Sequence, residues 1–319
     1  MALSRPALFA IKSPGFDKIS SPTIELNMPR ATISVIIPYF QAHQTIVRAV
    51  RSVLMQTVRP VEILVIDDGS PDDPSELLKE FGPAVTLIKK SNGGAVSARN
   101  MGIEHACGEW VAFIDADDYW EPTKLERQLA FGEHAELIGS RWFVESPGTP
   151  RRIWQVPQSS LFGKVIRAKD AEAFEVAMNL WTSVVLVRRD ALGEQRFVSG
   201  LEPAEDRDLW IRLASSMSVY LVPELLATYV QYENSLSNAN PDQDCGSMLK
   251  VIHRHSALLG PDGTRKQEAI VYRRWAGCHL ARGRPRSAII PAARRLSIQP
   301  TSPQAWWIMG KALGRSVLS

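Results

Sequence analysis

The chain has 319 residues, with 37 Lys and Arg against 34 Asp and Glu and a formal net charge of +3 at pH 7. Hydrophobic residues make up 45% and charged residues 22%, which excludes a chain disordered throughout, a collagen and a disulfide miniprotein. The three cysteines form no CxxC pair, which excludes a cysteine-ligated zinc site and favours a reducing compartment.

The first thirty residues contain Lys12, Asp17 and Lys18 and no continuous apolar stretch, which excludes a typical secretory signal peptide. No apolar run in the sequence approaches the ~18 residues of a membrane-spanning helix. We therefore expect residues 1–30 to be a flexible N-terminal extension, with a start at Met28 as the alternative. Together with the cysteine usage, this predicts a cytoplasmic protein.

Strands and helices alternate over the first third of the chain. Apolar, β-branched runs predict strands, and apolar residues at helical spacing predict helices between them. The predicted strands are 32–38, 61–66, 84–88 and 110–114, and the predicted helices are 44–56, 74–81 and 95–106. This alternation predicts an α/β fold with a mainly parallel sheet flanked by helices.

The alternation weakens beyond residue 120. Strands are expected at 180–187 and 219–222, and a short helix at 207–215. From Met248 the pattern is helical. Its breaks are at Gly260, Gly283 and Pro300, and residues 275–300 predict a helical hairpin that packs through Ala276, Ala288 and Ala292. We expect the Trp306-Trp307 pair to pack against this hairpin, with an interfacial helix as the alternative.

Charge is divided unevenly along the chain. Residues 251–319 carry a net charge of +10, and the remainder carries −7. Two interpretations of the basic segment remain open. It is either a solvated, arginine-rich helical face or a surface that contacts an anionic membrane or a phosphorylated acceptor. Nothing in the composition predicts a nucleic-acid partner.

Polar side chains follow each of the four predicted parallel strands. The segments are Tyr39–Gln41, Asp67–Ser70, Asn92–Gly94 and Asp115–Asp118. Ligands of parallel α/β sheets bind at the carboxyl ends of the strands, so we expect the functional site at this edge.

The carboxylates of Asp115 and Asp117 follow a buried strand directly. Such oxygen ligands suit Mg²⁺ or Mn²⁺, with water and phosphate completing the coordination. The alternative is an Asp-rich turn in which Asp118 caps the next helix.

Three other polar features have two interpretations each. Asp68 either lies in a plain turn or accepts a hydrogen bond from a nucleobase N–H. Asn92 and Gly93 begin either a plain turn or a loop whose amides approach phosphate. Arg99 either contacts a phosphate or pairs with a neighbouring Asp.

Five segments together resemble family 2 glycosyltransferases in order and spacing, over roughly residues 32–240. They are residues 33–40, 66–70, 92–100, 108–118 and 205–206. The resemblance implies a GT-A fold, that is, a Rossmann-like sheet flanked by helices, with a C-terminal helical appendix. The implied domains are the GT-A domain at 31–245, with a nucleotide-binding half (31–120) and an acceptor half (121–245), and a basic helical C-terminal region at 246–319.

The resemblance also implies roles for individual residues. Pro38 and Tyr39 match the loop that packs on the donor base, and Asp68 matches the carboxylate that binds the base edge. Asn92, Gly93, Arg99, Asp115 and Ala116 belong to the implied donor site. Asp117 and Asp115 match the DxD pair that binds Mn²⁺ or Mg²⁺, with Asp117 the direct ligand. Asp206 matches the general base, and Glu205 stands beside it.

The implied function is an inverting, metal-dependent transfer of a sugar from a nucleotide-diphosphate sugar, expected to be UDP-linked, to a hydroxyl. The implied acceptor is a glycan, a lipid-linked sugar or a protein, in surface polysaccharide or glycoconjugate synthesis. The Gln-x-x-Arg-Trp motif of processive synthases is missing, because Val271 stands where the glutamine would precede Arg274 and Trp275. Two alternatives remain: an inactive GT-A binding subunit and a nucleotidyltransferase.

Overall fold

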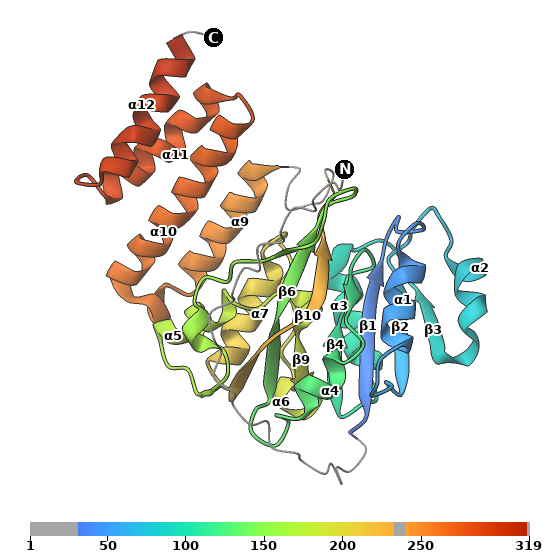
Figure 1. Ribbon diagram of the computed structural model, residues 1–319. Helices are drawn as coiled ribbons and strands as arrows, with labels where there is room; N and C mark the ends of the chain where they lie inside the picture. The colour runs from blue at the N-terminus through green and yellow to red at the C-terminus, as the bar shows by residue number, and fades with distance from the viewer. Residues whose placement is uncertain (1–30, 233–239, 318–319) are drawn as a thin grey trace, which may run out of the picture. The chain divides into compact units, whose positions relative to one another are not determined.

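The structure is a computed structural model that describes residues 31–232 and 240–317, with side chains up to residue 314 (Figure 1). Its strands form one sheet with the order β3-β2-β1-β4-β9-β6-β10-β5. Two short strands, β7 and β8, pair with β6 and β10 outside this path.

The first half of the sheet is parallel, as predicted. Its strands are β1 (Ile33–Tyr39), β2 (Glu62–Asp67), β3 (Val85–Lys89) and β4 (Trp110–Phe113). The connecting helices are α1 (Ile46–Leu54), α2 (Ser75–Leu78) with the 3₁₀ helix η1 (Lys79–Ala84), and α3 (Gly94–His105). β1 lies between β2 and β4 and is buried on both faces, which explains its continuous apolar sequence.

The second half of the sheet is mixed. Its strands are β5 (Tyr119–Trp120), β6 (Leu137–Glu145), β7 (Arg152–Ile153), β8 (Val165–Ile166), β9 (Leu186–Arg188) and β10 (Val219–Val230). Its helices are α4 (Lys124–Leu129), η2 (Ser159–Leu161), α5 (Ala171–Ala177), η3 (Thr182–Val184), α6 (Arg189–Leu192) and α7 (Glu205–Ala214). β9 pairs antiparallel with both β4 and β6, and β6 pairs parallel with β10.

Two of the predicted strands differ in length from the structure. Only the end of the strand expected at 180–187 lies in the sheet, because residues 182–184 form the 3₁₀ helix η3 before β9. The strand expected at 219–222 continues to Val230, across register shifts between Val222 and Ala227.

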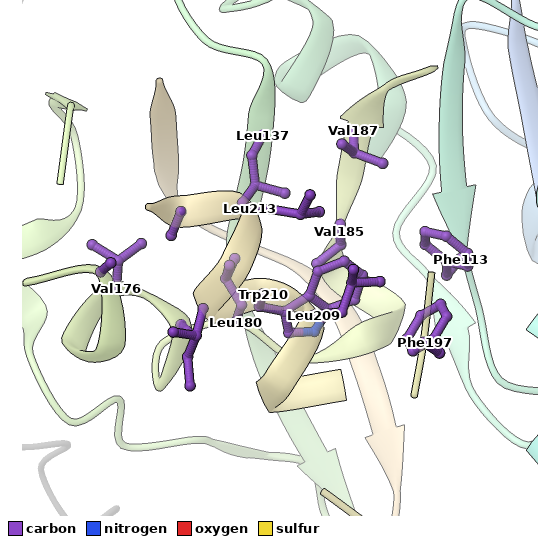
Figure 2. Packing of buried hydrophobic residues seen from close by; sticks show 14 of the residues in the cluster. Phe113, Leu137, Val176, Leu180, Val185, Val187, Phe197, Leu209, Trp210 and Leu213 are labelled. Atoms are coloured by element: carbon purple, nitrogen blue, oxygen red, sulfur yellow. The ribbon is translucent and has the colours of Figure 1, made fainter. Parts of the chain in front are cut away.

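Alternate residues of the strands enter two apolar cores, one on each face of the sheet. On one face, Trp210 of α7 contacts Phe113 of β4 and Phe197, with ring centroids 5.9 and 5.7 Å apart (Figure 2). Phe113 and Phe197 also meet edge to face at 5.6 Å. This aromatic packing holds the beginning of α7 beside the end of β4, and both carry predicted site residues.

Residues 240–317, which the structure describes after the sheet domain, form four helices: α9 (Pro241–Arg254), α10 (Ser256–Ala281), α11 (Pro285–Ile298) and α12 (Pro303–Val317). α9 packs on α7, and α10 packs on α5. Asn240 caps α9 by accepting hydrogen bonds from the amides of Asp242 and Gln243. The predicted boundary at 245/246 therefore falls inside α9 rather than between elements.

The predicted helical hairpin is confirmed as α10 and α11, which meet through Ala276, Ala288 and Ala292. Gly260 interrupts the helical geometry of α10, and Gly283 lies between α10 and α11 with a positive φ of 67°. The expected packing of Trp306 and Trp307 is wrong, since their side chains are 58% and 59% exposed. No helix among the described residues is long and apolar enough to cross a membrane.

Candidate active site

Three neighbouring strands bring the predicted polar segments to one edge of the sheet. Tyr39 ends β1 opposite Asp67 of β2, and Ile36 lies opposite Phe113 of β4. Asp67 and Asp68 therefore lie on one side of the end of β1, and Asp115 to Asp117 lie on its other side. This is the carboxyl edge at which parallel sheets bind ligands, as the sequence predicts.

Asp68 holds the loop between β3 and α3. It is 2% exposed, and its carboxylate accepts hydrogen bonds from Lys90 Nζ at 2.5 Å and from the amides of Gly93 and Gly94 at 3.0 and 2.7 Å. The exposed Asn92 lies in the loop held this way. Because these donors satisfy the carboxylate, the structure assigns Asp68 a loop-positioning contact, and its contact with a nucleobase stays a prediction.

Tyr39 ends β1 fully buried, next to the half-buried Pro38. Its hydroxyl donates to the carbonyl oxygen of Asp72 at 2.8 Å. Burial, followed by the Asp72 side chain and the charges of Asp67 and Asp73, raises the pKa of the Tyr39 phenol, which therefore stays protonated. Tyr39 thus fixes the turn after β2 against the end of β1, and the donor base would lie beside this turn if the predicted role holds.

Arg99 joins the two halves of the candidate site. It is 6% exposed, and its guanidinium donates to Asp115 Oδ1 and to Glu205 Oε1, each at 2.7 Å. Burial alone would lower the pKa of Arg99, but the charges of Asp115, Glu205 and Asp206 raise it above its ordinary value. The sequence left open whether Arg99 contacts a phosphate or pairs with a neighbouring Asp. In the structure it pairs with the carboxylates of Asp115 and Glu205.

The Asp117 carboxylate lies near that of Asp115, and the charges of Arg48 and Arg99 offset only part of their repulsion. Arg48 donates to the Asp117 backbone oxygen at 2.5 Å, but the carboxylate accepts no hydrogen bond from another residue that the structure describes. Burial, followed by the charge of Asp115, raises the pKa of Asp117 to about 6. A cation would relieve this repulsion, and the two carboxylates with the adjacent Ala116 backbone fit a hard, oxygen-binding metal.

Residues 31–232 and 240–317 contain no cluster of three or more His, Cys, Asp or Glu side chains arranged around a metal position. The metal therefore stays a prediction, in which Asp115 and Asp117 would be its protein ligands. Magnesium-type sites commonly use one or two carboxylates and take their other ligands from water and substrate phosphates.

The predicted capping role of Asp118 is wrong. Asp118 is fully buried and accepts hydrogen bonds from Ser183 Oγ at 2.7 Å and from the Val230 amide at 3.1 Å. The following helix, α4, begins only at Lys124. Ser183 Oγ also accepts from the Asp115 amide at 3.0 Å. Asp118 and Ser183 therefore fix the backbone that carries Asp115 and Asp117.

Glu205 and Asp206 begin α7, but their environments differ. Glu205 is 6% exposed, is held by Arg99, and leaves Oε2 buried without a hydrogen-bond partner among the described residues. Burial and the charge of Asp206 raise the pKa of Glu205, against the opposing effect of Arg99. Asp206 is partly exposed and accepts from Thr182 Oγ1 at 3.2 Å. Of the two carboxylates, Asp206 is the more exposed, with 13% of its side chain accessible against 8% for Glu205.

Sequence reasoning missed three residues that position the site: Lys90, Thr182 and Ser183. A signal was available for Lys90, since it follows the third parallel strand at the carboxyl edge. Thr182 and Ser183 gave no such signal, because their partners lie 24 and 65 or more residues away in the sequence.

We expect Arg99→Met to lower the free energy of unfolding by about 3 to 5 kcal/mol, because it leaves the carboxylates of Asp115 and Glu205 without their shared cation. Urea unfolding measures this change. Arg127→Met is the matched control, since the pair of Arg127 and Glu224 at 3.3 Å is 55% and 47% exposed and is worth less than about 1 kcal/mol. Equal losses in the two variants would contradict the bridging role of Arg99.

Comparisons with known proteins identify the family and the fold of the chain. An uncharacterized glycosyltransferase of Rickettsia conorii is 34% identical over 189 residues, which are 59% of this chain and 31% of that protein. The chain thus spans about a third of the length of that relative. Over 243 residues, 75% of this chain and 90% of the relative, it is 26% identical to the Escherichia coli UDP-Glc:alpha-D-GlcNAc-diphosphoundecaprenol beta-1,3-glucosyltransferase WfaP.

Among solved structures, residues 1–349 of S. aureus TarS in complex with UDP-GlcNAc share the fold, with a TM-score of 0.59. The sequence identity is 16%, and the match covers 89% of each chain. The expected GT-A fold is therefore confirmed. The sequence pattern described as Glycosyl transferase family 2 matches residues 34–194, which is half of the chain. The chain belongs to glycosyl transferase family 2.

Proposed function

We propose that the protein is an inverting, non-processive glycosyltransferase that moves a sugar from a UDP-sugar to a hydroxyl acceptor. The arrangement around Arg99 carries this proposal. Its guanidinium holds Asp115 on the donor side and Glu205 at the start of α7 in one cluster, with Asp206 next to Glu205. The carboxylates that we propose as general base and as metal ligands therefore belong to one cluster.

In this proposal Asp206 accepts the proton of the acceptor hydroxyl as that oxygen attacks the anomeric carbon. Thr182 orients the Asp206 carboxylate, and Arg99 keeps the carboxylates of Glu205 and Asp115 in place. Asp117 and Asp115 would hold Mn²⁺ or Mg²⁺. A metal ion bound there would offset the negative charge of the departing diphosphate. Pro38, Tyr39, Asp68, Asn92 and Gly93 would surround the nucleotide.

The relatives support a UDP-sugar donor and a lipid-linked acceptor. The name of WfaP states glucosyl transfer from UDP-Glc to a diphosphoundecaprenol-linked sugar, and TarS was crystallised with UDP-GlcNAc. A diphosphoundecaprenol-linked acceptor, as in the name of WfaP, would place this chain in surface polysaccharide or glycoconjugate synthesis. The missing Gln-x-x-Arg-Trp motif favours transfer of single sugars over processive synthesis.

The test is the melting temperature of the purified chain with UDP, GDP, CDP or TDP, each with Mn²⁺ or with a chelator. A nucleotide that binds the folded state at about 100 times its Kd stabilises by about 2.7 kcal/mol, so we expect UDP with Mn²⁺ to raise Tm by about 5 to 10 °C. The chelator should remove most of this shift. A shift with another nucleotide would replace the donor assignment.

Turnover separates an active transferase from an inactive binding subunit. UDP release from UDP-glucose and UDP-GlcNAc, with a diphosphate-lipid sugar as acceptor, is expected to depend on both donor and acceptor. UDP binding without turnover in this screen would favour the inactive subunit. Pyrophosphate release from UTP and a sugar phosphate would instead favour a nucleotidyltransferase.

A further inference from the structure

The last described helix, α12, is apolar on two opposite sides. Ala305, Ile308 and Ala312 are buried against α10 and α11 and form its inner side. The opposite side, the outer face of α12, consists of Trp306, Trp307, Gly310 and Leu313, and its three large side chains are 58%, 59% and 48% exposed. In Figure 1, α12 lies at the end of the row formed by α9, α10 and α11.

The two indoles of this face are held at the surface. Trp306 Nε1 donates to the carbonyl oxygen of Pro300 at 2.8 Å, and Lys311 Nζ lies 3.7 Å from the centre of the Trp307 ring. Exposed tryptophans beside a lysine are typical of helices that lie in the interface of a bilayer, with the rings at headgroup depth and the ammonium at the phosphates.

The helices α10 and α11, on which α12 packs, carry a charge that complements an anionic surface. Five exposed cations on α10 and α11 have no carboxylate partner among the described residues: Arg265, Lys266, Arg273, Arg286 and Arg294. Residues 251–319 contain only two acids, Asp262 and Glu268, and Glu268 is paired with His253 at 2.7 Å. The helices α10 to α12 are therefore strongly basic, while the rest of the chain is acidic.

The same charge disfavours a second copy of the chain on this face. A symmetric contact between two α12 helices would bring two regions of net charge +10 together, and like charges across an interface cost free energy. An anionic lipid surface accepts the indoles and neutralises the arginines at once. The apolar face alone would allow either a second copy of the chain or a lipid surface, and the positive charge favours an anionic lipid surface.

We propose that the outer face of α12 docks this protein on an anionic membrane surface, with Trp306 and Trp307 in the headgroup layer and the arginines of α10 and α11 against lipid phosphates. This docking is independent of the proposed sugar transfer, because it involves no residue of the candidate active site.

The experiment is co-sedimentation of the full chain, without nucleotide, with phosphatidylcholine vesicles that either lack phosphatidylglycerol or contain about a third of it. We expect binding to the anionic vesicles that weakens with salt, and little binding to the neutral ones. Trp306→Ala with Trp307→Ala should lower the partition coefficient at least about tenfold. Arg286→Gln with Arg294→Gln should lower binding to anionic vesicles about tenfold.

Two matched variants control for general effects of losing a tryptophan or a cation. Trp154→Ala removes another exposed tryptophan, and Arg127→Gln removes an exposed arginine on α4. Neither should change vesicle binding, and circular dichroism checks that all variants are folded. Brominated lipid should quench the tryptophan fluorescence of the wild type more than that of the Trp306 and Trp307 double variant.

Three results would overturn the proposal. One is equal binding to neutral and anionic vesicles, or no binding to either. Another is unchanged binding of the folded Trp306 and Trp307 double variant. The third is a concentration-dependent dimer in sedimentation equilibrium that this double variant abolishes, without vesicle binding, which would assign the face to a second copy of the chain.

Discussion

Replacing Asp117 by asparagine is expected to lower kcat for sugar transfer by about a thousandfold and to remove the stimulation by Mn²⁺. The charge stabilisation that a metal supplies is worth several kcal/mol, which corresponds to this factor. In the structure the Asp117 carboxylate has no partner from another described residue, and burial with the charge of Asp115 raises its pKa to about 6. Such a carboxylate contributes little to folding, so the neutral amide should leave Tm unchanged or higher.

Two measurements test this assignment. Steady-state kinetics over a range of Mn²⁺ concentrations give the loss of kcat, and the Mn²⁺-dependent part of the UDP-induced Tm shift should disappear in the same variant. Asp73→Asn is the control, because Asp73 is an exposed carboxylate paired with Lys89 at 2.7 Å near the same edge. If Asp117→Asn kept both its turnover and its response to Mn²⁺, Asp117 would not be a metal ligand.

The first half of the fold could be predicted because its strands carry a local signal. β1, β2 and β4 are buried on both faces, so burial demands continuous apolar runs, and helices of ordinary length separate them. β6 gives no such signal. Its Gly139 is required by packing, since a Cβ there would lie 2.3 Å from Leu180 and 3.0 Å from Leu221, and this glycine interrupts the pattern of a strand.

The sequence predicts which residues belong to the candidate site, but it does not predict which residues they contact. Strand ends place Asp68 and Asp115 at one edge, and a resemblance to a known family adds Asp206. The partners depend on long-range packing. Arg99 meets Asp115, 16 residues away in the sequence, and Glu205, 106 residues away, and no spacing rule connects them. The preference of Asp for helix N-caps suggested such a role for Asp118. In the structure Asp118 is instead buried and accepts hydrogen bonds from Ser183 and from the Val230 amide.

Asp206→Asn is expected to lower kcat by about a thousandfold while UDP binding stays unchanged, since general base catalysis contributes between about 10² and 10⁴. The amide keeps the shape of the side chain. Its Oδ1 can still accept the hydrogen bond from the Arg207 amide, and its Nδ2, in place of Oδ2, can donate to Thr182 Oγ1, so α7 should keep its position. The loss should therefore fall on kcat, with the donor KM and the UDP-induced Tm shift as in the wild type.

Two neighbouring variants separate the base from the residues that position it. Thr182→Val removes one hydrogen bond to Asp206 and should lower kcat only about tenfold. Glu205→Gln weakens the contact with Arg99 and should lower stability together with kcat, because Glu205 is buried in that ion pair. If Asp206→Asn kept its kcat, another group would have to accept the proton of the acceptor hydroxyl. Glu205 could be that base only after its contact with Arg99 opens, because Glu205 is buried.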